Sequence, residues 1–346
     1  MTIVEPARPV TGGIDTHGDV HVAAALDPVG GLLGTETFVA DPAGYRALLG
    51  WLQTFGAVGK VGIEGTGAYG AGVARFLAGS GVEIVEVDRP DRQARRKHGK
   101  SDPLDAIEAA RAVLSGRARG QAKSRDGAVE AIRVLVVAKR SARWGRTRAL
   151  TQMRHLGYTA PDQVRSQVKG LSIPQLVTVA AGLGPTTSAD PVTAATKVAL
   201  SSLAQRVRAL DAEIARLDAL LAPLVHATAP ELLDLVGVGI DTAASLLVAA
   251  GDNPERLSSE AAWAHLCGVA PIPASSGKVT RHRLDRGGDR QANAALWRVV
   301  IVRLTCDPDT RAYVERRSKE GRSKREIIRI LKRYVAREVY RCLPRG

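Results

Sequence analysis

Residues 11–39 read TGGIDTHGDVHVAAALDPVGGLLGTETFV, and this stretch decides the fold of the N-terminal part of the chain. It predicts three short strands, at 11–15, 19–26 and 32–39. The turn Asp27-Pro28-Val29-Gly30-Gly31 closes a hairpin between the second and the third. The chain is therefore expected to begin with a meander of three strands.

Helices and strands alternate after this meander. Asp41 is a favourable helix N-cap and Pro42 a favourable first helical residue, and Gly79 and Gly81 stop a later helix. The expected elements are a helix at 42–54, a strand at 60–64, a helix at 68–79, a strand at 82–87 and a helix at 102–115.

The order βββαβαβα predicts a mixed five-stranded sheet with helices packed on it. This order is similar to the ribonuclease H-like fold. A doubly wound nucleotide-binding fold is the alternative, but the opening hairpins and the lack of a G-x-G-x-x-G turn or a Walker A loop in the sequence argue against it. The fold class is thus α/β at the N-terminus, followed by mostly α structure.

With 346 residues, the chain is too long for a single compact core. We expect a sheet domain at 1–118, a basic helix, linker and coiled coil at 119–228, and a mostly helical domain at 229–346. The sequence contains no apolar run long enough to cross a membrane, no signal peptide and no C-x-x-C pair. These features predict a cytoplasmic, nucleoid-associated protein without a membrane partner.

The charge is concentrated in two segments. The net charge is +14, and residues 117–154 and 311–346 each carry +9, so the two segments account for more than the whole excess. Such concentration favours binding to a polyanion, nucleic acid above all. Two solvated helix faces are the alternative interpretation.

Helical patterns dominate the middle of the chain. Residues 119–155 are expected to form a long basic helix, whereas 157–195, which contain four prolines, are expected to be irregular and receive no function. A coiled coil at 199–225 would join copies of the chain into dimers that pair into tetramers, although packing inside one chain is the alternative. Its apolar residues, spaced alternately by three and four, are Leu200, Leu203, Val207, Leu210, Ile214, Leu217, Leu221 and Leu224.

Residues 231–250 predict a helix, a tight glycine turn and a second helix. The turn at Gly237 and Gly239 resembles helix-hairpin-helix modules, in which turn amides and a helix N-terminus bind a backbone phosphate. A plain corner between two helices is the alternative.

Four carboxylates form a candidate metal site. Asp15 ends the first predicted strand, Glu64 ends the fourth, and Asp102 and Asp105 share a face at the start of the helix at 102–115. In a ribonuclease H-like sheet these positions converge, and clustered carboxylates bind Mg²⁺ for phosphodiester chemistry. Taken one at a time, Asp102 or Ser101 could instead be a helix cap, Asp15 a turn residue and Glu64 a surface residue. A transition-metal site built around His17 and His21 is disfavoured.

A serine pair, Ser275 and Ser276, lies in the Pro/Gly-framed loop PIPASSGKVTRHR. A nucleophilic serine needs exposure and nearby cations, and several basic residues follow this loop. Loop serines are common, so the residues alone do not single out a nucleophile.

The motifs GIDTHGDVH, GIEGTGAYG, KSDPLDAIEAAR, GVGIDTAA and CGVAPIPASSGKVTRHRLDRGGDRQAN together resemble the DEDD transposases of the IS110 insertion-sequence family. The resemblance runs almost end to end and implies a RuvC-like domain, a coiled-coil middle and a C-terminal transposase domain. It implies that Asp15, Glu64, Asp102 and Asp105 bind one or two Mg²⁺ ions, with Mn²⁺ as a substitute. It further implies that Ser276 attacks DNA to form a phosphoserine, with Ser275 as the fallback nucleophile, in a composite site formed by the two domains.

The resemblance also implies the partners: double-stranded target and donor DNA, and a structured noncoding bridge RNA that pairs with both. A metal-dependent hydrolytic nuclease of the junction-resolving kind and a non-enzymatic nucleic-acid-binding protein remain the rival interpretations. The residues expected to contact nucleic acid are Arg95, Arg96, Lys97, Lys100, Lys139, Arg140, Arg143, Arg146, Gly237, Gly239, Lys278, Arg281, Arg283, Arg286, Arg290, Arg322, Lys324 and Arg325.

Overall fold

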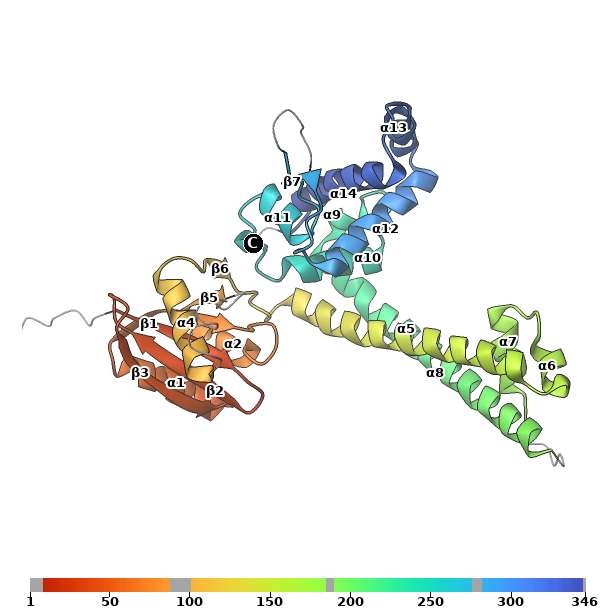
Figure 1. The fold of residues 1–346 in the computed structure, drawn as a ribbon, viewed down its shortest axis with the longest axis horizontal. Helices are drawn as coiled ribbons and strands as arrows, with labels where there is room; N and C mark the ends of the chain where they lie inside the picture. The colour runs from red at the N-terminus through yellow and green to blue at the C-terminus, as the bar shows by residue number, and fades with distance from the viewer. Residues whose placement is uncertain (1–8, 88–100, 185–189, 276–281, 345–346) are drawn as a thin grey trace, which may run out of the picture. The chain divides into compact units, whose positions relative to one another are not determined.

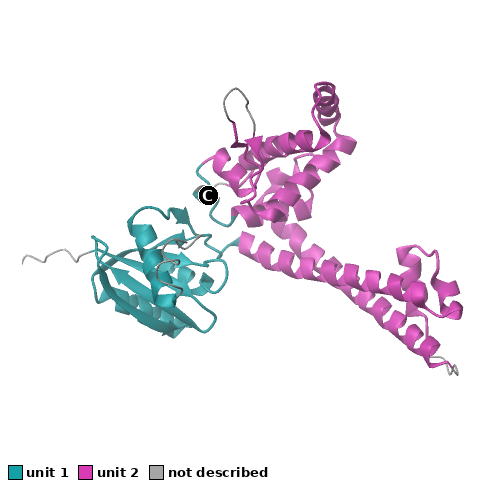
Figure 2. Cartoon of the chain, in the orientation of Figure 1, with its two compact units in different colours: residues 1–127, 251–258, 345–346 teal, residues 128–250, 259–344 magenta. Residues whose placement is uncertain are grey.

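The structure is a computed structural model that describes residues 9–87, 101–184, 190–275 and 282–344, apart from the side chain of Glu255. The chain divides into two compact units (Figure 2). Unit 1 comprises residues 1–127, 251–258 and 345–346, and unit 2 comprises residues 128–250 and 259–344. The chain thus leaves unit 1, builds much of unit 2, and returns to unit 1 for a short segment.

Unit 1 contains the mixed sheet that the sequence predicts. Its strand order is β3-β2-β1-β4-β5-β6, in which β1 pairs antiparallel with β2 and parallel with β4. The additional strand, β6, is too short to show a periodic pattern in the sequence and pairs with the edge of β5. The strands are β1 (Pro9–Thr16), β2 (Val20–Leu26), β3 (Leu32–Val39), β4 (Ala57–Glu64), β5 (Glu83–Val87) and β6 (Gly120–Gln121).

Helices cover both faces of this sheet (Figure 1). On one face, α1 (Pro42–Gln53) and α2 (Ala71–Gly79) bury Leu48, Leu52 and Leu77 against Ile14 and Ile63 of the central strands. The predicted cap of α1 is confirmed, because the Asp41 carboxylate accepts a hydrogen bond from the Gly44 amide at 2.7 Å. On the other face lies α4 (Asp102–Leu114), which packs on β1, β2 and β4.

Two glycines let α4 lie close against the central strands. A Cβ at Gly13 would stand 2.1 Å from the carbonyl oxygen of Ala106, and one at Gly62 would stand 2.7 Å from that of Ala109. Both glycines therefore mark places where the helix backbone meets the strand backbone. Their strands are side by side, which fixes the position of the first turn of α4 relative to the strand ends.

Unit 2 contains a long helical hairpin, α5 (Ala128–Thr159) and α8 (Pro191–Thr228) (Figure 1). The two helices run antiparallel, because Lys139 pairs with Asp218 whereas Arg146, further along α5, pairs with the earlier Asp211. Several residues of the predicted coiled-coil seam, among them Leu200 and Val207, are buried in this single chain. The seam therefore has a partner helix within the chain.

The expectation that 157–195 are irregular is wrong for much of the segment. Residues 162–168 and 173–181 form helices α6 (Asp162–Val168) and α7 (Ile173–Ala181), which pack with α5 and α8 around a core that includes Met153, Leu176 and Leu200. Prolines are tolerated in the first turn of a helix, where no backbone N–H is needed. Pro161 and Pro174 occupy such starting positions, so they mark where helices begin.

The rest of unit 2 is mostly helical, as expected. Its core includes Trp263, Leu296, Val299 and Val335, which are almost completely buried. No helix in the described part of the chain is both long and apolar enough to cross a membrane. The elements are α9 (Pro230–Leu233), α10 (Ile240–Ala250), α11 (Glu260–Leu266), β7 (Ile272–Pro273), β8 (His282–Arg283), α12 (Arg290–Cys306), α13 (Pro308–Lys319) and α14 (Lys324–Arg341), and the short 3₁₀ helix η1 (Pro254–Arg256) belongs to unit 1.

Candidate metal centre and nucleic-acid interface

The strand alternation of β1 and β4 sets the direction of the first two acidic residues. Successive side chains point to opposite faces of a strand, so Asp15 lies on the same face as Gly13, and Glu64 on the same face as Gly62. Both glycines face α4. Asp15 and Glu64 are neighbours because β1 and β4 are in register at Ile14 and Ile63, and the Thr16 hydroxyl also donates a hydrogen bond to the carbonyl of Glu64 at 2.8 Å.

The other two acidic residues lie on the first turn of α4. Asp102 is the first residue of the helix, and Asp105 follows one turn later and is buried. The N-cap residue is Ser101, whose side chain makes no capping bond, and Asp102 lies inside the helix and is not its N-cap. Because α4 crosses β1 at Gly13, its first turn reaches the end of β1.

His17 joins the two groups of acidic residues. Its Nε2 lies 3.1 Å from the Asp15 carboxylate and 3.3 Å from that of Asp102. Ligand atoms of Asp15, His17 and Asp102 all lie within 4.8 Å of one another, a spacing that one cation can bridge. The sequence signal for this role is the short separation in Asp15-Thr16-His17, a role for His17 that differs from the disfavoured transition-metal site with His21.

The electrostatics of Asp15 indicate how crowded the carboxylates are. Burial raises the pKa of Asp15, the nearby His17 lowers it, and the negative charges of Asp105 and Asp102 raise it again, with the rise prevailing. A carboxylate whose pKa is raised by like charges is a favourable ligand for a cation, which would relieve the repulsion. The residues present therefore fit a divalent metal ion.

The basic residues of α5 have differing surroundings. Lys139 is buried and pairs with Asp218 and Asp241, Arg143 pairs with Asp241 at 2.7 Å, and Arg146 pairs with Asp211. Burial alone would raise the pKa of Asp241, but hydrogen bonds from Lys139 and Arg143 lower it below its usual value. Lys139 thus connects α5 to α8 and α10 and does not present its charge to solvent.

The loop that contains Ser275 connects the two strands of a small hairpin. Strands β7 and β8 pair antiparallel, Ile272 with Arg283 and Pro273 with His282, and Ser275 is exposed at the end of the described part of the loop. Ser276, Lys278 and Arg281 lie outside the described residues, as do Arg95, Arg96, Lys97 and Lys100. Arg283 on β8 is exposed, as are Arg286 and Arg290 after the hairpin.

The base of this hairpin is fixed tightly to the helices of unit 2. Asn293 on α12 donates to the carbonyls of Cys267 at 2.8 Å and Gly268 at 3.0 Å, and Lys332 donates to the Asn293 side chain at 2.9 Å. A Cβ at Gly288 would stand 2.2 Å from the Gly268 amide nitrogen. Gly288, the second glycine of DRGGD, therefore permits a close backbone approach at the base of the hairpin.

The two turn glycines have different roles in the structure. Gly237 has a φ of +82°, and a Cβ there would stand 3.1 Å from the carbonyl of Val299, so this glycine packs on α12. Gly239 is exposed, with nothing within 4 Å of its Cβ position. Of the two, only Gly239 leaves room for a ligand. On α14, Lys324 and Arg325 are exposed, and Arg322 precedes them 3.7 Å from Glu326.

The chain is similar to known transposases and insertion-element proteins. A transposase family model, DEDD_Tnp_IS110, matches residues 12–156, and a second model, described as Transposase IS116/IS110/IS902 family, matches residues 229–315. The chain is 24% identical to the insertion element IS900 uncharacterized 42 kDa protein of Mycobacterium paratuberculosis, over 94% of both chains. It is 32% identical to the insertion element IS110 uncharacterized 43.6 kDa protein of Streptomyces coelicolor, over 42% of this chain and 35% of that protein.

The acidic strand ends, the basic helices and these matches define a transposase of an insertion sequence, a class of enzyme that binds and cuts DNA. The chain belongs to the IS110 family.

Proposed function

We propose that this transposase cuts and rejoins double-stranded DNA through a covalent serine–phosphate intermediate, assisted by divalent metal bound in a RuvC-like N-terminal domain. The observation that supports this proposal most is the gathering of Asp15, His17 and Asp102 around one point, with Asp105 close enough to raise the pKa of Asp15. The proposed boundaries are 1–118 for the metal-binding domain, 119–228 for the helical middle and 229–346 for the transposase domain.

Asp15, Glu64, Asp102 and Asp105 are the proposed metal ligands. A bound Mg²⁺ or Mn²⁺ would supply Lewis-acid stabilisation of the charge that builds up on the scissile phosphate. His17 holds the Asp15 and Asp102 carboxylates together at 3.1 and 3.3 Å, and so keeps the proposed ligands in place before metal binds. This preorganisation reduces the cost of assembling the site.

Ser276 is the proposed nucleophile, and Ser275 the alternative. In the proposed step the serine oxygen bonds to the scissile phosphorus while the phosphorus–oxygen bond to the neighbouring deoxyribose breaks. The serine proton is released to solvent, and the departing sugar oxygen takes up a proton. Because one phosphoester replaces another, the bond energy is retained for rejoining. Arg283, Arg286 and Arg290, which are exposed beside the loop, are the proposed phosphate contacts.

The proposal extends to partners. A bridge RNA would deliver target and donor specificity by base pairing, as in other RNA-guided systems. Arg140, Lys324 and Arg325 are the proposed backbone contacts on the basic helices. We also propose that copies of the chain associate through residues 199–225. Leu203, Leu210 and Ile214 on α8 keep part of their surface exposed and so are available to a second copy. Light scattering on the purified full-length chain would give the oligomeric state.

The decisive experiment looks for a protein–DNA adduct that survives denaturation. The full-length protein is incubated with the complete element, its RNA and Mg²⁺, and compared with Ser276→Ala, Ser275→Ala and Asp15→Asn. We expect an adduct with wild type and Ser275→Ala, mapped to Ser276 by mass spectrometry, and none with the other two variants.

The two rivals give different results. A hydrolytic nuclease would cut DNA without an adduct, Ser276→Ala would cut as well as wild type, and Asp15→Asn would be inactive. A non-enzymatic binding protein would leave the DNA uncut in every sample, and its DNA affinity would be the same in all the variants. Either result would overturn the serine mechanism.

A further inference from the structure

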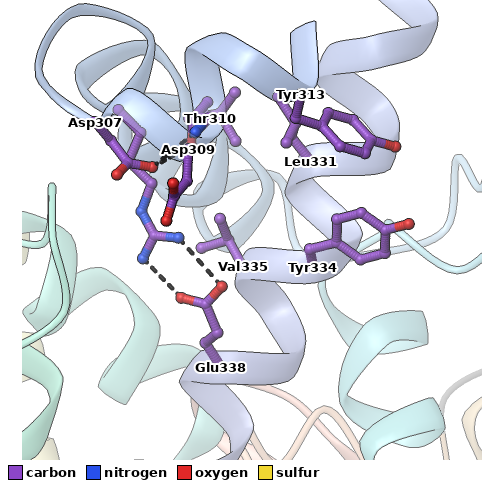
Figure 3. Close-up of a pocket in the computed structure, with 10 residues that line it drawn as sticks. Asp307, Asp309, Thr310, Tyr313, Leu331, Tyr334, Val335 and Glu338 are labelled. Atoms are coloured by element: carbon purple, nitrogen blue, oxygen red, sulfur yellow. Dashed lines mark hydrogen bonds and ion pairs between the residues drawn. The ribbon is translucent and has the colours of Figure 1, made fainter. Parts of the chain in front are cut away.

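A pocket of about 300 Å³ lies between α12, α13 and α14 of unit 2 (Figure 3). This volume is at the lower end of the range for small-molecule sites, roughly 300–1,000 Å³. Leu331 and Val335 of α14 are buried and give the pocket an apolar floor. The pocket takes no part in the proposed cutting chemistry.

Two tyrosines form one side of the pocket. The rings of Tyr313 and Tyr334 meet edge to face, with centroids 5.9 Å apart and planes at 78° (Figure 3). Tyr334 is 43% exposed, so part of its ring is available for stacking. Aromatic rings of this kind are the usual platforms on which unpaired bases stack.

Carboxylates lie on the opposite side of the pocket (Figure 3). The Asp307 carboxylate is used as the cap of α13, where it accepts hydrogen bonds from the amide and hydroxyl of Thr310. The Glu338 carboxylate receives two hydrogen bonds from Arg303, at 2.7 and 3.2 Å. Asp309 adds an exposed carboxylate to the lining, so hydrogen-bond acceptors face a ligand that carries N–H donors.

Positive charge also lies beside the pocket, next to the ring of Tyr313. The Arg316 guanidinium lies 5.3 Å from the centre of the Tyr313 ring and that of Arg317 lies 6.0 Å from it. An anionic group suits these guanidiniums, and N–H donors suit the carboxylates of the lining. A nucleotide meets both requirements. Its base carries an aromatic ring and N–H donors, and its phosphate carries the negative charge.

We propose that this pocket, referred to below as the tyrosine pocket, receives a single unpaired nucleobase that carries an amino group, with guanine the best fit. The inference rests on the proposed function only in taking nucleic acid as the ligand. Guanine presents two neighbouring N–H donors to one carboxylate, whereas thymine and uracil have no amino group. The base stacks on Tyr334, its donors face Asp309, and the adjoining phosphate lies near Arg316.

The test uses the full-length protein and two fluorescently labelled ten-nucleotide strands, one of thymidine alone and one with a single central guanine. Affinities are measured by anisotropy over a range of salt concentrations. We expect wild type to bind the guanine strand about tenfold more tightly, in line with the discrimination that one bidentate pair of hydrogen bonds to a base provides. Tyr334→Leu and Asp309→Asn should each reduce this preference severalfold, while Tyr334→Phe keeps the stacking ring and most of the preference.

A matched control is Tyr158→Leu, since Tyr158 is 73% exposed on α5 and far along the chain from the pocket. It should leave the preference for guanine unchanged. Because stacking adds no ionic contact, the salt dependence should be the same in Tyr334→Leu and wild type. Equal affinity of wild type for both strands, or an unchanged preference in Tyr334→Leu, would overturn the proposal. An adduct assay that fails while the preference persists would count against the serine mechanism alone.

Discussion

Asp15 is a proposed metal ligand, but its negative charge lowers the stability of the folded protein. It is 8% exposed and shares its neighbourhood with Asp102 and Asp105, so its ionised form is held in the folded protein at a cost. His17 offsets part of that cost at 3.1 Å. Crowded carboxylates of this kind are expected where a site is built for a ligand and not for the stability of the fold.

The first prediction concerns Asp15→Asn. The pKa of Asp15 is raised in the folded state, so its charged carboxylate destabilises the protein at neutral pH. In the presence of a chelator, the Asp15→Asn variant should therefore melt at a temperature equal to or higher than that of wild type. Saturating Mg²⁺ should raise the melting temperature of wild type by a few degrees and leave that of Asp15→Asn unchanged. Differential scanning fluorimetry checks both points. A wild type indifferent to Mg²⁺ would contradict the metal site.

The second prediction concerns His21, which is fully buried and stacks on Tyr45 with the ring centroids 5.7 Å apart. Burial lowers the pKa of His21 below its usual value of 6.5, so the unfolded chain takes up the proton first as pH falls. Stability should therefore decline below about pH 6.5, by at most about 1.4 kcal/mol per pH unit from this group. His21→Phe should show a shallower decline between pH 7 and 5 in denaturant titrations, and parallel curves for the two proteins would be evidence against this role.

At the scale of the elements, α4 decides whether the site exists. The helix carries two of the four proposed ligands, and its height above the sheet is set by Gly13 and Gly62, which let it approach the strands directly. Its placement therefore depends on residues that have no side chain and take no part in any proposed step.

The third prediction is that Gly13→Ala disrupts the site without altering any ligand. The added Cβ would stand 2.1 Å from the Ala106 carbonyl, so α4 must shift, at a cost of roughly 1–3 kcal/mol. DNA cleavage should fall at least tenfold, because the ligands move with the helix. Gly59→Ala on β4 is the matched control, since nothing lies within 4 Å of its Cβ position. Chemical denaturation and a cleavage assay would show whether the two variants differ.

The fourth prediction separates structure from binding on α5. Lys139→Met leaves the Asp218 and Asp241 carboxylates without their buried partner and should destabilise the protein by about 1–3 kcal/mol, less than a fully buried pair would because both acids are partly exposed. DNA affinity of the folded variant should be unchanged. Arg140→Ala should do the reverse, weakening DNA binding with little effect on stability. A loss of DNA affinity in Lys139→Met would contradict this prediction and would mean that Lys139 contributes to DNA binding.

Much of unit 1 could be predicted because its signals are local. The hairpin turn after Leu26, the cap at Asp41 and the acidic first turn of α4 each depend on a few adjacent residues. Features that depend on contacts between distant residues could not be predicted in this way. The burial of Lys139 is set by Asp218 and Asp241, far along the chain, and the tyrosine pocket needs three helices to meet. The prolines at 157–195 mislead because a proline that starts a helix and one that breaks it look alike in composition.

At the scale of the whole molecule, the acidic and the basic groups are unevenly divided between the two units. The acidic cluster belongs to unit 1, whereas residues 128–154 and 311–344, which hold most of the excess positive charge, belong to unit 2. The field of these basic segments would attract a polyanion to unit 2.

The fifth prediction measures that attraction. Replacing Arg322, Lys324 and Arg325 together by glutamine should weaken duplex binding and reduce the slope of log affinity against log salt by up to about 2.7, or roughly 0.9 for each phosphate that the protein no longer neutralises. The control replaces Arg206, Arg208 and Arg216, three exposed arginines of α8 outside the basic segments. Fluorescence titrations at several salt concentrations give the slopes. Equal reductions in the two triple variants would mean that the protein binds DNA by its overall charge.

The brief return of the chain to unit 1 has a consequence for how the family can vary. Asn253 donates to the carbonyl of Ala122 at 2.8 Å and accepts from the Ser124 amide at 3.2 Å, so the chain ends flanking residues 128–250 are tied together at their root. Lengthening a segment whose two ends are held together costs little entropy, since each doubling of its length adds only about 0.6 kcal/mol. The helical hairpin can thus be lengthened, shortened or exchanged during evolution while its point of attachment stays intact, which makes it the natural place for related elements to acquire different reach.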